Sequence, residues 1–204
     1  DDHSHSSIPK NIQPKSLSDC TRVYFEVDYD IYQDKGNSTV PFMIGLFHQM
    51  ATLFANEALN VVMSDLFIWT EPSNYYGGSS TMLYTFQRNT VEMDAELGHL
   101  VSYRNARSGI AAVIDGLCHP LLENRLCFSG ITPNYLQIPT YSRSLKLLTH
   151  EMGHLFGSRH THACVWNGDF TAIDGCAGFT EGSCSVGPIP GAGTIMSYCD
   201  SRNR

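Results

Sequence analysis

The chain has 204 residues, 42% of them hydrophobic, and a formal net charge of −7. This length and composition predict a single globular domain with a sizeable buried core. The negative charge and the scattered Lys and Arg residues argue against nucleic-acid binding, and no apolar run reaches the roughly 20 residues that cross a bilayer. We therefore expect a monomer that binds neither nucleic acid nor membrane.

The composition changes along the chain and divides the predicted domain into three parts. Residues 1–19 are polar and rich in Ser and Pro, which predicts an extended arm. No signal peptide or propeptide is visible there, so we expect a mature form whose propeptide has been removed. Residues 20–157 predict an upper lobe of the α/β (α+β) class, with a twisted mixed sheet and helices. Residues 158–204 are rich in Gly, Cys, Ser and Pro, which predicts a small, irregular, disulfide-rich lower lobe.

Hydrophobic periodicity predicts the elements of the upper lobe. Alternating apolar and polar residues predict a strand over 22–30, and helical spacing behind Pro41 predicts a helix over 41–59. Further along the chain we expect strands at 61–70 and 81–86, a helix at 94–104 and a strand at 109–114. The three-four-three spacing of Leu145, Leu148, Met152 and Leu155 predicts a last helix from about 142 to 156.

The segment "HEMGHLFGSRH", residues 150–160, carries the strongest chemical signal. His150 and His154 lie one helical turn apart, where two imidazoles can bind one Zn²⁺, and the Glu151 carboxylate beside them can take a proton from water. Gly157 allows a left-handed turn after the helix, which lets His160 return as a third ligand. Three neutral nitrogens with a fourth position open are typical of catalytic zinc rather than structural zinc.

This segment resembles the signature H-E-x-x-H-x-x-G-x-x-H of the metzincin zinc metalloproteases, which the chain meets in full. Metzincins also have a methionine turn beneath the metal, and "GTIMSYC" places Met196 36 residues after His160. The order and spacing of "RVYFEVDYDIY", "GIAAVIDGLC" and "LLTHEMGHLFG" look like the adamalysin or reprolysin branch. The resemblance covers nearly the whole chain and implies a metzincin-like fold.

Two departures from that branch bear on the site. The branch usually has Asp after the third His, whereas Thr161 and His162 follow here; His162 could compete with His160 as a ligand, although the spacing from Gly157 fits His160 better. The sequence Met-Ser-Tyr is similar to the turn of astacins and serralysins, whose tyrosine contacts zinc and stabilises the oxyanion. It implies the same role for Tyr198, with a plain buried turn tyrosine as the alternative.

The resemblance implies a secreted zinc endopeptidase that hydrolyses protein or peptide substrates. Glu151 would act as general base towards water and then pass the proton to the leaving amine. An extended substrate would pair antiparallel with an edge strand at Gly109, Ile110, Ala111 and Ala112, although a plain interior strand fits the same residues. The alternatives are a non-catalytic adhesion or binding module on this fold, which would be expected to lose the base or a ligand, and a structural zinc site completed by His162 or Tyr198.

Seven cysteines, four of them after residue 163, predict disulfides and an oxidising, extracellular location. We expect Cys164 and Cys176 to pair with Cys184 and Cys199, Cys118 to pair with Cys127, and Cys20 to be left over; six paired cysteines allow 15 connectivities. The resemblance also places Glu26 and Asp94 near a position where some adamalysins bind Ca²⁺. Two solvated surface carboxylates are the alternative.

Overall fold

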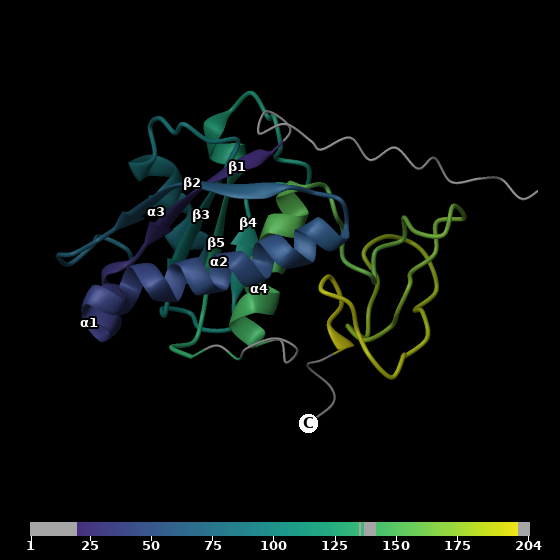
Figure 1. Ribbon diagram of the computed structural model, residues 1–204. Helices are drawn as coiled ribbons and strands as arrows, with labels where there is room; N and C mark the ends of the chain where they lie inside the picture. The colour runs from purple at the N-terminus through teal and green to yellow at the C-terminus, as the bar shows by residue number, and fades with distance from the viewer. Residues whose placement is uncertain (1–19, 135, 137–141, 200–204) are drawn as a thin grey trace, which may run out of the picture.

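The computed structural model describes residues 20–134, 136 and 142–199 (Figure 1). The predicted arm, residues 1–19, lies outside this part of the chain. Within it, no helix is both long and apolar enough to cross a membrane.

A five-stranded mixed sheet forms the centre of the structure, as predicted. Its strands lie in the order β2 (Val61–Ile68), β1 (Thr21–Val27), β3 (Leu97–Ser102), β5 (Leu126–Gly130) and β4 (Gly109–Ala111). The first four strands are parallel, and β4 pairs antiparallel with β5 alone. The short strand β4 is therefore an edge strand of the sheet.

Helices cover both faces of this sheet. They are α1 (Tyr29–Lys35), α2 (Thr39–Asn56), α3 (Ser79–Asn89) and α4 (Arg143–Leu155), with short 3₁₀ turns at Gly36–Ser38 and Leu122–Arg125. The long helix α2 and the helix α4 share one apolar cluster with the sheet, and α3 belongs to a second cluster that includes Leu100, Leu126 and Phe128. In Figure 1, α2 crosses in front of α4 and α3 lies on the far side of the strands.

Two predicted elements were wrong in type. Residues 81–86, predicted as a strand, belong to helix α3, which buries Met82, Leu83 and Phe86 on one face. Residues 94–104, predicted as a helix, contain the strand β3, whose six residues are all buried. Because β3 lies between two parallel strands and is covered on both faces, its sequence lacks the alternation that identifies a half-exposed strand.

The other predicted elements are confirmed with shifted ends. Strand β1 stops at Val27 because the Asp28 side chain accepts a hydrogen bond from Tyr29 N at 2.7 Å and so caps α1. Helix α1 and strand β5 had not been predicted. Helix α4 lies within one residue of its predicted ends.

Beyond Leu155, the described residues form an irregular region, seen in green to yellow beside α4 in Figure 1. Among its described residues, β-bridges occur at two places, Ala163–Glu181 and Trp166–Thr171. Two disulfides, Cys164–Cys184 and Cys176–Cys199, connect its loops. Both pairs agree with the predicted pairing of this region.

The predicted Cys118–Cys127 disulfide was wrong. Cys127 lies on β5 in the core, where its Sγ donates to the Gly98 carbonyl at 3.7 Å, whereas Cys118 is exposed. A thiol fixed on a central strand cannot reach one at the surface without moving the strand. Both residues are free thiols, as is Cys20.

Candidate metal centre

Helix α4 supplies the first two histidines of the site. Its first turn is capped by Ser142, whose hydroxyl accepts from Leu145 N at 3.2 Å. Gly157, with φ of +94°, donates its N–H to the His154 carbonyl at 2.9 Å and ends the helix in the predicted left-handed turn. The chain then turns back, and His160 returns to the face of α4 that carries His150 and His154.

The three histidines converge on one point. His160 Nε2 lies 3.2 Å from His150 Nε2 and 3.1 Å from His154 Nε2. Each opposite ring nitrogen, Nδ1, has an oxygen partner: the Ile195 carbonyl at 2.9 Å for His150, the Ser158 carbonyl at 2.8 Å for His154 and Glu181 Oε1 at 2.6 Å for His160. Because each Nδ1–H donates to an oxygen, the three Nε2 lone pairs point towards one another.

This arrangement fits a metal cation. Burial lowers the pKa of His150 to about 4 and also lowers the pKa of His154, so both rings are neutral at pH 7. Neutral imidazoles whose Nδ1 atoms all donate cannot hydrogen-bond one another through their Nε2 atoms, and a shared cation satisfies all three lone pairs. Three converging imidazole nitrogens are a ligand set that suits Zn²⁺.

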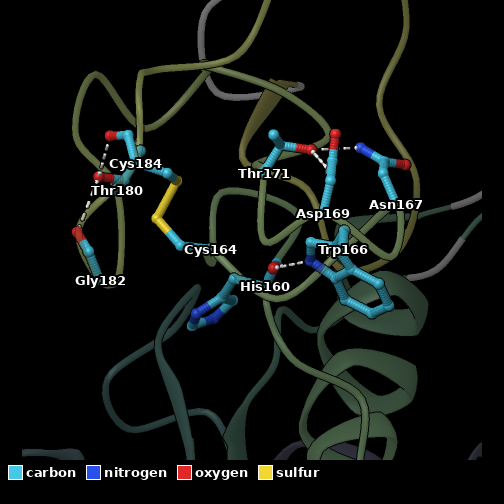
Figure 2. Close-up of a disulfide and its surroundings, with 9 residues drawn as sticks. All are labelled: His160, Cys164, Trp166, Asn167, Asp169, Thr171, Thr180, Gly182 and Cys184. Atoms are coloured by element: carbon cyan, nitrogen blue, oxygen red, sulfur yellow. Dashed lines mark hydrogen bonds between the residues drawn. A yellow bond between two sulfur atoms is a disulfide. The ribbon is translucent and has the colours of Figure 1, made fainter.

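The irregular region holds His160 through its backbone and through Glu181. Figure 2 shows the Trp166 indole N–H donating to the His160 carbonyl, at 2.8 Å, beside the Cys164–Cys184 disulfide. The Glu181 carbonyl accepts from Cys164 N at 2.8 Å, which ties this carboxylate to the same disulfide. Glu181 had not been predicted, since it lies 21 residues from His160 and no motif marks it.

Glu151 lies next to the histidines and against the edge strand. Its side chain is buried, and burial raises its pKa to about 8, while a hydrogen bond from the Ala111 backbone N–H opposes this shift. A Cβ atom on Gly109 would lie 2.5 Å from Glu151 Oε1, so the absence of a side chain there allows the close approach. Glu151 therefore lies between helix α4 and strand β4.

The structure brings His160, and not His162, to the other two histidines. The His162 ring is fully buried and stacks on the His160 ring with centroids 4.8 Å apart. Its Nε2 lies 3.3 Å from Glu181 Oε1. His162 therefore belongs to the packing around His160 and Glu181.

The segment containing Met196 and Tyr198 lies beneath and beside the histidines. Met196 is buried, and its Sδ lies 3.0 Å from the place that a Cβ on Gly153 would occupy, between the two histidines of α4. The Tyr198 hydroxyl lies 3.1 Å from His160 Nε2, and the side chain is partly exposed. Burial raises the pKa of Tyr198, so the phenol is protonated at neutral pH.

A buried aspartate supports this segment from below. Asp174 accepts from Ser197 Oγ at 2.8 Å and from Cys176 N at 3.0 Å, and Ser197 Oγ in turn accepts from Cys199 N at 3.0 Å. Asp174 thereby connects the segment to the Cys176–Cys199 disulfide. Asp174 had not been predicted, because an acidic residue in a loop is expected to lie at the surface unless its hydrogen-bond partners are known.

Two cavities lie on either side of Glu151. Both are lined by Gly109, His150, Glu151 and Tyr198. One, of about 290 Å³, extends along the first turns of α4 towards Arg107, and the other, of about 360 Å³, extends past His154 and His160. The second is also lined by Ile110, Ala111 and Ala112, so all four residues of the predicted substrate strand lie at the site.

The residues predicted for calcium do not form a site. The Glu26 carboxylate is buried and accepts from Tyr24 Oη at 2.8 Å, Trp69 Nε1 at 2.7 Å and Tyr75 Oη at 2.6 Å. Asp94 pairs with Arg22 at 2.8 Å. Protein donors occupy the Glu26 carboxylate, and Asp94 stays exposed beside Arg22, so the structure does not support Ca²⁺ there. Asp94 agrees with the alternative of a solvated surface carboxylate, whereas Glu26 does not.

Comparison with known protein families identifies one family that matches the chain. The sequence profile described as metallo-peptidase family M12 matches residues 17–204, which include all described strands, helices and site residues. A search among curated proteins finds no significant match.

Proposed function

The chain belongs to metallo-peptidase family M12, and from this premise we propose that it is a secreted zinc endopeptidase with Glu151 as its general base. Members of the family are zinc-dependent peptidases, so the substrates are proteins or peptides. The observation that carries the proposal is that His160 Nε2 lies 3.1 to 3.2 Å from the Nε2 atoms of His154 and His150, beside a buried carboxylate.

His150, His154 and His160 would hold the zinc ion. Their Nδ1 hydrogen bonds fix each ring before the metal binds, which reduces the reorganisation that binding requires. A zinc ion held by three histidines supplies a Lewis acid that polarises a peptide carbonyl and makes water nucleophilic near neutral pH.

Glu151 would move the proton. Its carboxylate takes a proton from the attacking water and passes it to the nitrogen of the departing amine. Burial raises the pKa of Glu151, and a raised pKa makes its carboxylate a stronger proton acceptor. The Ala111 N–H fixes the carboxylate in the space between the two cavities.

Tyr198 would stabilise the negative charge that develops on the carbonyl oxygen. Its hydroxyl lies 3.1 Å from His160 Nε2, and the raised pKa keeps its proton available for donation. This role corresponds to the astacin- and serralysin-like tyrosine implied by the sequence. Met196, beneath the histidines, would provide the apolar floor of the site.

The substrate would bind along β4. This strand has β5 on one side only, and its residues line the cavity that contains the histidines. An extended peptide added antiparallel to that edge gains main-chain hydrogen bonds and passes beside Glu151.

Secretion is supported by the two disulfides, because such bonds persist in oxidising compartments. The alternative of a non-catalytic binding module has no observation in its favour, since the base and all three histidines lie together. A structural zinc site would bind the metal without cleaving peptides.

The test is cleavage of casein by the wild type and by Glu151→Ala, with the zinc content of each protein measured. We expect the wild type to cleave casein and Glu151→Ala to lose at least about 100-fold in kcat/KM while keeping zinc. Glu92→Ala, at an exposed carboxylate that lines neither cavity, serves as a control that retains activity. Zinc-loaded wild type that cleaves neither casein nor a randomised peptide library would contradict the proposal.

A further inference from the structure

The cavity beside Glu151 on the Arg107 side is strongly cationic. Three of the chain's 13 Lys and Arg residues, Arg107, Arg143 and Lys146, line it, although the net charge of the protein is −7. Among the described residues, Glu151 is the one carboxylate in its wall, and the cavity on the other side of Glu151 has no Lys or Arg in its wall. The positive charge is therefore confined to one side of the proposed reaction centre.

Local contacts place Arg107 and Lys146 at the cavity. Arg107 has φ of +75°, a conformation that side-chain-bearing residues rarely adopt, and its N–H donates to the Gly130 carbonyl at 2.6 Å. Lys146 Nζ donates to the Ser197 carbonyl at 2.6 Å, next to Tyr198. These contacts hold the Arg107 backbone and the Lys146 ammonium group at the cavity.

Arg143 stands where a cation does not help its own helix. It is the first residue of α4, whose first turn contains no acidic residue, and the partial positive charge of a helix N-terminus repels a guanidinium. No carboxylate within the described residues pairs with Arg143. The charge of Arg143 and the N-terminus of α4 therefore add to the positive potential of the cavity.

The direction of strand β4 tells which part of a substrate enters this cavity. A peptide antiparallel to β4 has its amino-terminal half beside Ala111 and Ala112 and its carboxyl-terminal half beside Gly109 and Arg107. The cationic cavity therefore receives the side chain that follows the scissile bond.

We infer that this cavity is a subsite for an acidic side chain, so that the enzyme cleaves preferentially on the amino side of Asp or Glu. The inference rests on the proposed peptidase function. Guanidinium groups bind carboxylates through two parallel, charge-assisted hydrogen bonds, and Arg107 and Arg143 can both supply them. A Lys side chain in the same position meets like charges, and a neutral side chain forms no charge-assisted hydrogen bond with Arg107 or Arg143.

The experiment compares amidated peptides that differ only in the residue after the scissile bond, Asp, Asn, Leu or Lys, in a sequence chosen from casein cleavage sites. We expect kcat/KM for Asp to exceed that for Asn by about 10- to 100-fold, the range of charge-assisted hydrogen bonds, with Lys lowest. Mass spectrometry of each product confirms that the scissile bond is the same.

Variants test whether these residues cause the preference. Arg143→Gln should bring the Asp-to-Asn ratio towards one, and Arg143→Glu should favour Lys over Asp. Arg88→Gln, at an exposed arginine on α3 outside the cavity, is the matched control and should keep the wild-type ratio. Zinc content and circular dichroism of each variant establish that the site is intact.

The remaining outcomes separate the two proposals. Equal cleavage of the Asp, Asn and Leu peptides overturns the acidic subsite and leaves the peptidase function standing. Preference for a free C-terminal carboxylate over an amide, with Asp and Asn equal, also overturns it, because the anion bound would then be the chain end. No cleavage of any peptide or of casein overturns the proposed function and this inference with it.

Discussion

The sheet region, the described residues within 20–155, and the irregular region, residues 156–199, hold their parts of the candidate site by different physical means. In the first, His150, Glu151 and His154 stand on a helix whose apolar side belongs to a continuous core. In the second, His160 and Tyr198 lie on loops fixed by two disulfides, by the partly exposed Glu181 and the buried Asp174, and by side-chain-to-backbone hydrogen bonds. The position of His160 Nε2, within 3.2 Å of the Nε2 atoms of His150 and His154, therefore depends on both hydrophobic burial and covalent crosslinks.

The comparison predicts that a substitution in the apolar core destabilises both regions, whereas loss of a disulfide destabilises the irregular region alone. The largest effect is expected for Leu148→Ala, because Leu148 is fully buried in the core beneath the site. We expect a loss of about 2 to 5 kcal/mol in the free energy of unfolding, measured by urea denaturation. Val91→Ala, at a residue that is 85% exposed, should change it by less than about 0.5 kcal/mol. Equal effects of the two substitutions would contradict the assignment of the core.

Removal of a disulfide should act on the irregular region alone. Replacing Cys176 and Cys199 by Ser opens a loop of 23 residues and should destabilise that region by about 3 kcal/mol. We expect zinc binding and activity to weaken while the far-ultraviolet circular dichroism of the sheet and helices persists. In a urea titration, loss of zinc binding and of the circular dichroism signal at the same urea concentration would show that the two regions unfold as one unit.

The sheet region should show a pH dependence of its own through His99. This residue is fully buried on β3, its Nε2 lies 2.8 Å from Ser129 Oγ, and burial lowers its pKa to about 3. Between pH 6.5 and 3 the unfolded chain takes up a proton that the folded chain does not, so stability is lost as the pH falls through this range. At pH 4 the loss amounts to about 3 kcal/mol.

The measurement is the free energy of unfolding of the metal-free protein at pH 7 and pH 4. His99→Gln, which can keep a hydrogen bond to Ser129, should lose less stability over this interval than the wild type. The same pH dependence in both proteins would show that other buried groups are responsible.

The smallest effect is expected where the irregular region orients the His160 side chain. Glu181→Gln removes the negative charge of the side chain that accepts a hydrogen bond from His160 Nδ1 at 2.6 Å. The substitution should weaken zinc binding by about 10- to 100-fold. Competition with a chromogenic chelator measures this affinity without reference to activity. Glu123→Gln, at a carboxylate outside both cavities, serves as the control. Unchanged affinity in Glu181→Gln would mean that the backbone contacts alone fix His160.

Sequence patterns predicted the structure correctly where candidate ligand residues and a clear hydrophobic periodicity lie in the same segment. The helix carrying His150 and His154 was predicted to within one residue at each end, because its apolar seam and its polar face have distinct spacings. The left-handed turn at Gly157 and the pairing of Cys164 and Cys176 with Cys184 and Cys199 were also predicted. Strand β3 was taken for a helix because burial on both faces removes the alternation of apolar and polar residues.

The partners of the site residues required the tertiary structure. Glu181 and Asp174 lie 21 and 23 residues from the groups they bind, and nothing in their local sequence distinguishes them from surface carboxylates. The cationic cavity likewise joins Arg107, from the loop before β4, with Arg143 and Lys146 of α4, residues too far apart to suggest one subsite.

Local sequence was sufficient to predict the class of fold and to single out the three histidines and the glutamate as candidates, because their spacing along one helix and one turn is a property of local geometry. The tertiary structure decided which oxygen fixes each imidazole, which cysteines are free, and which side of Glu151 carries positive charge. These depend on burial and on contacts between distant segments, and only the packed chain brings those segments together.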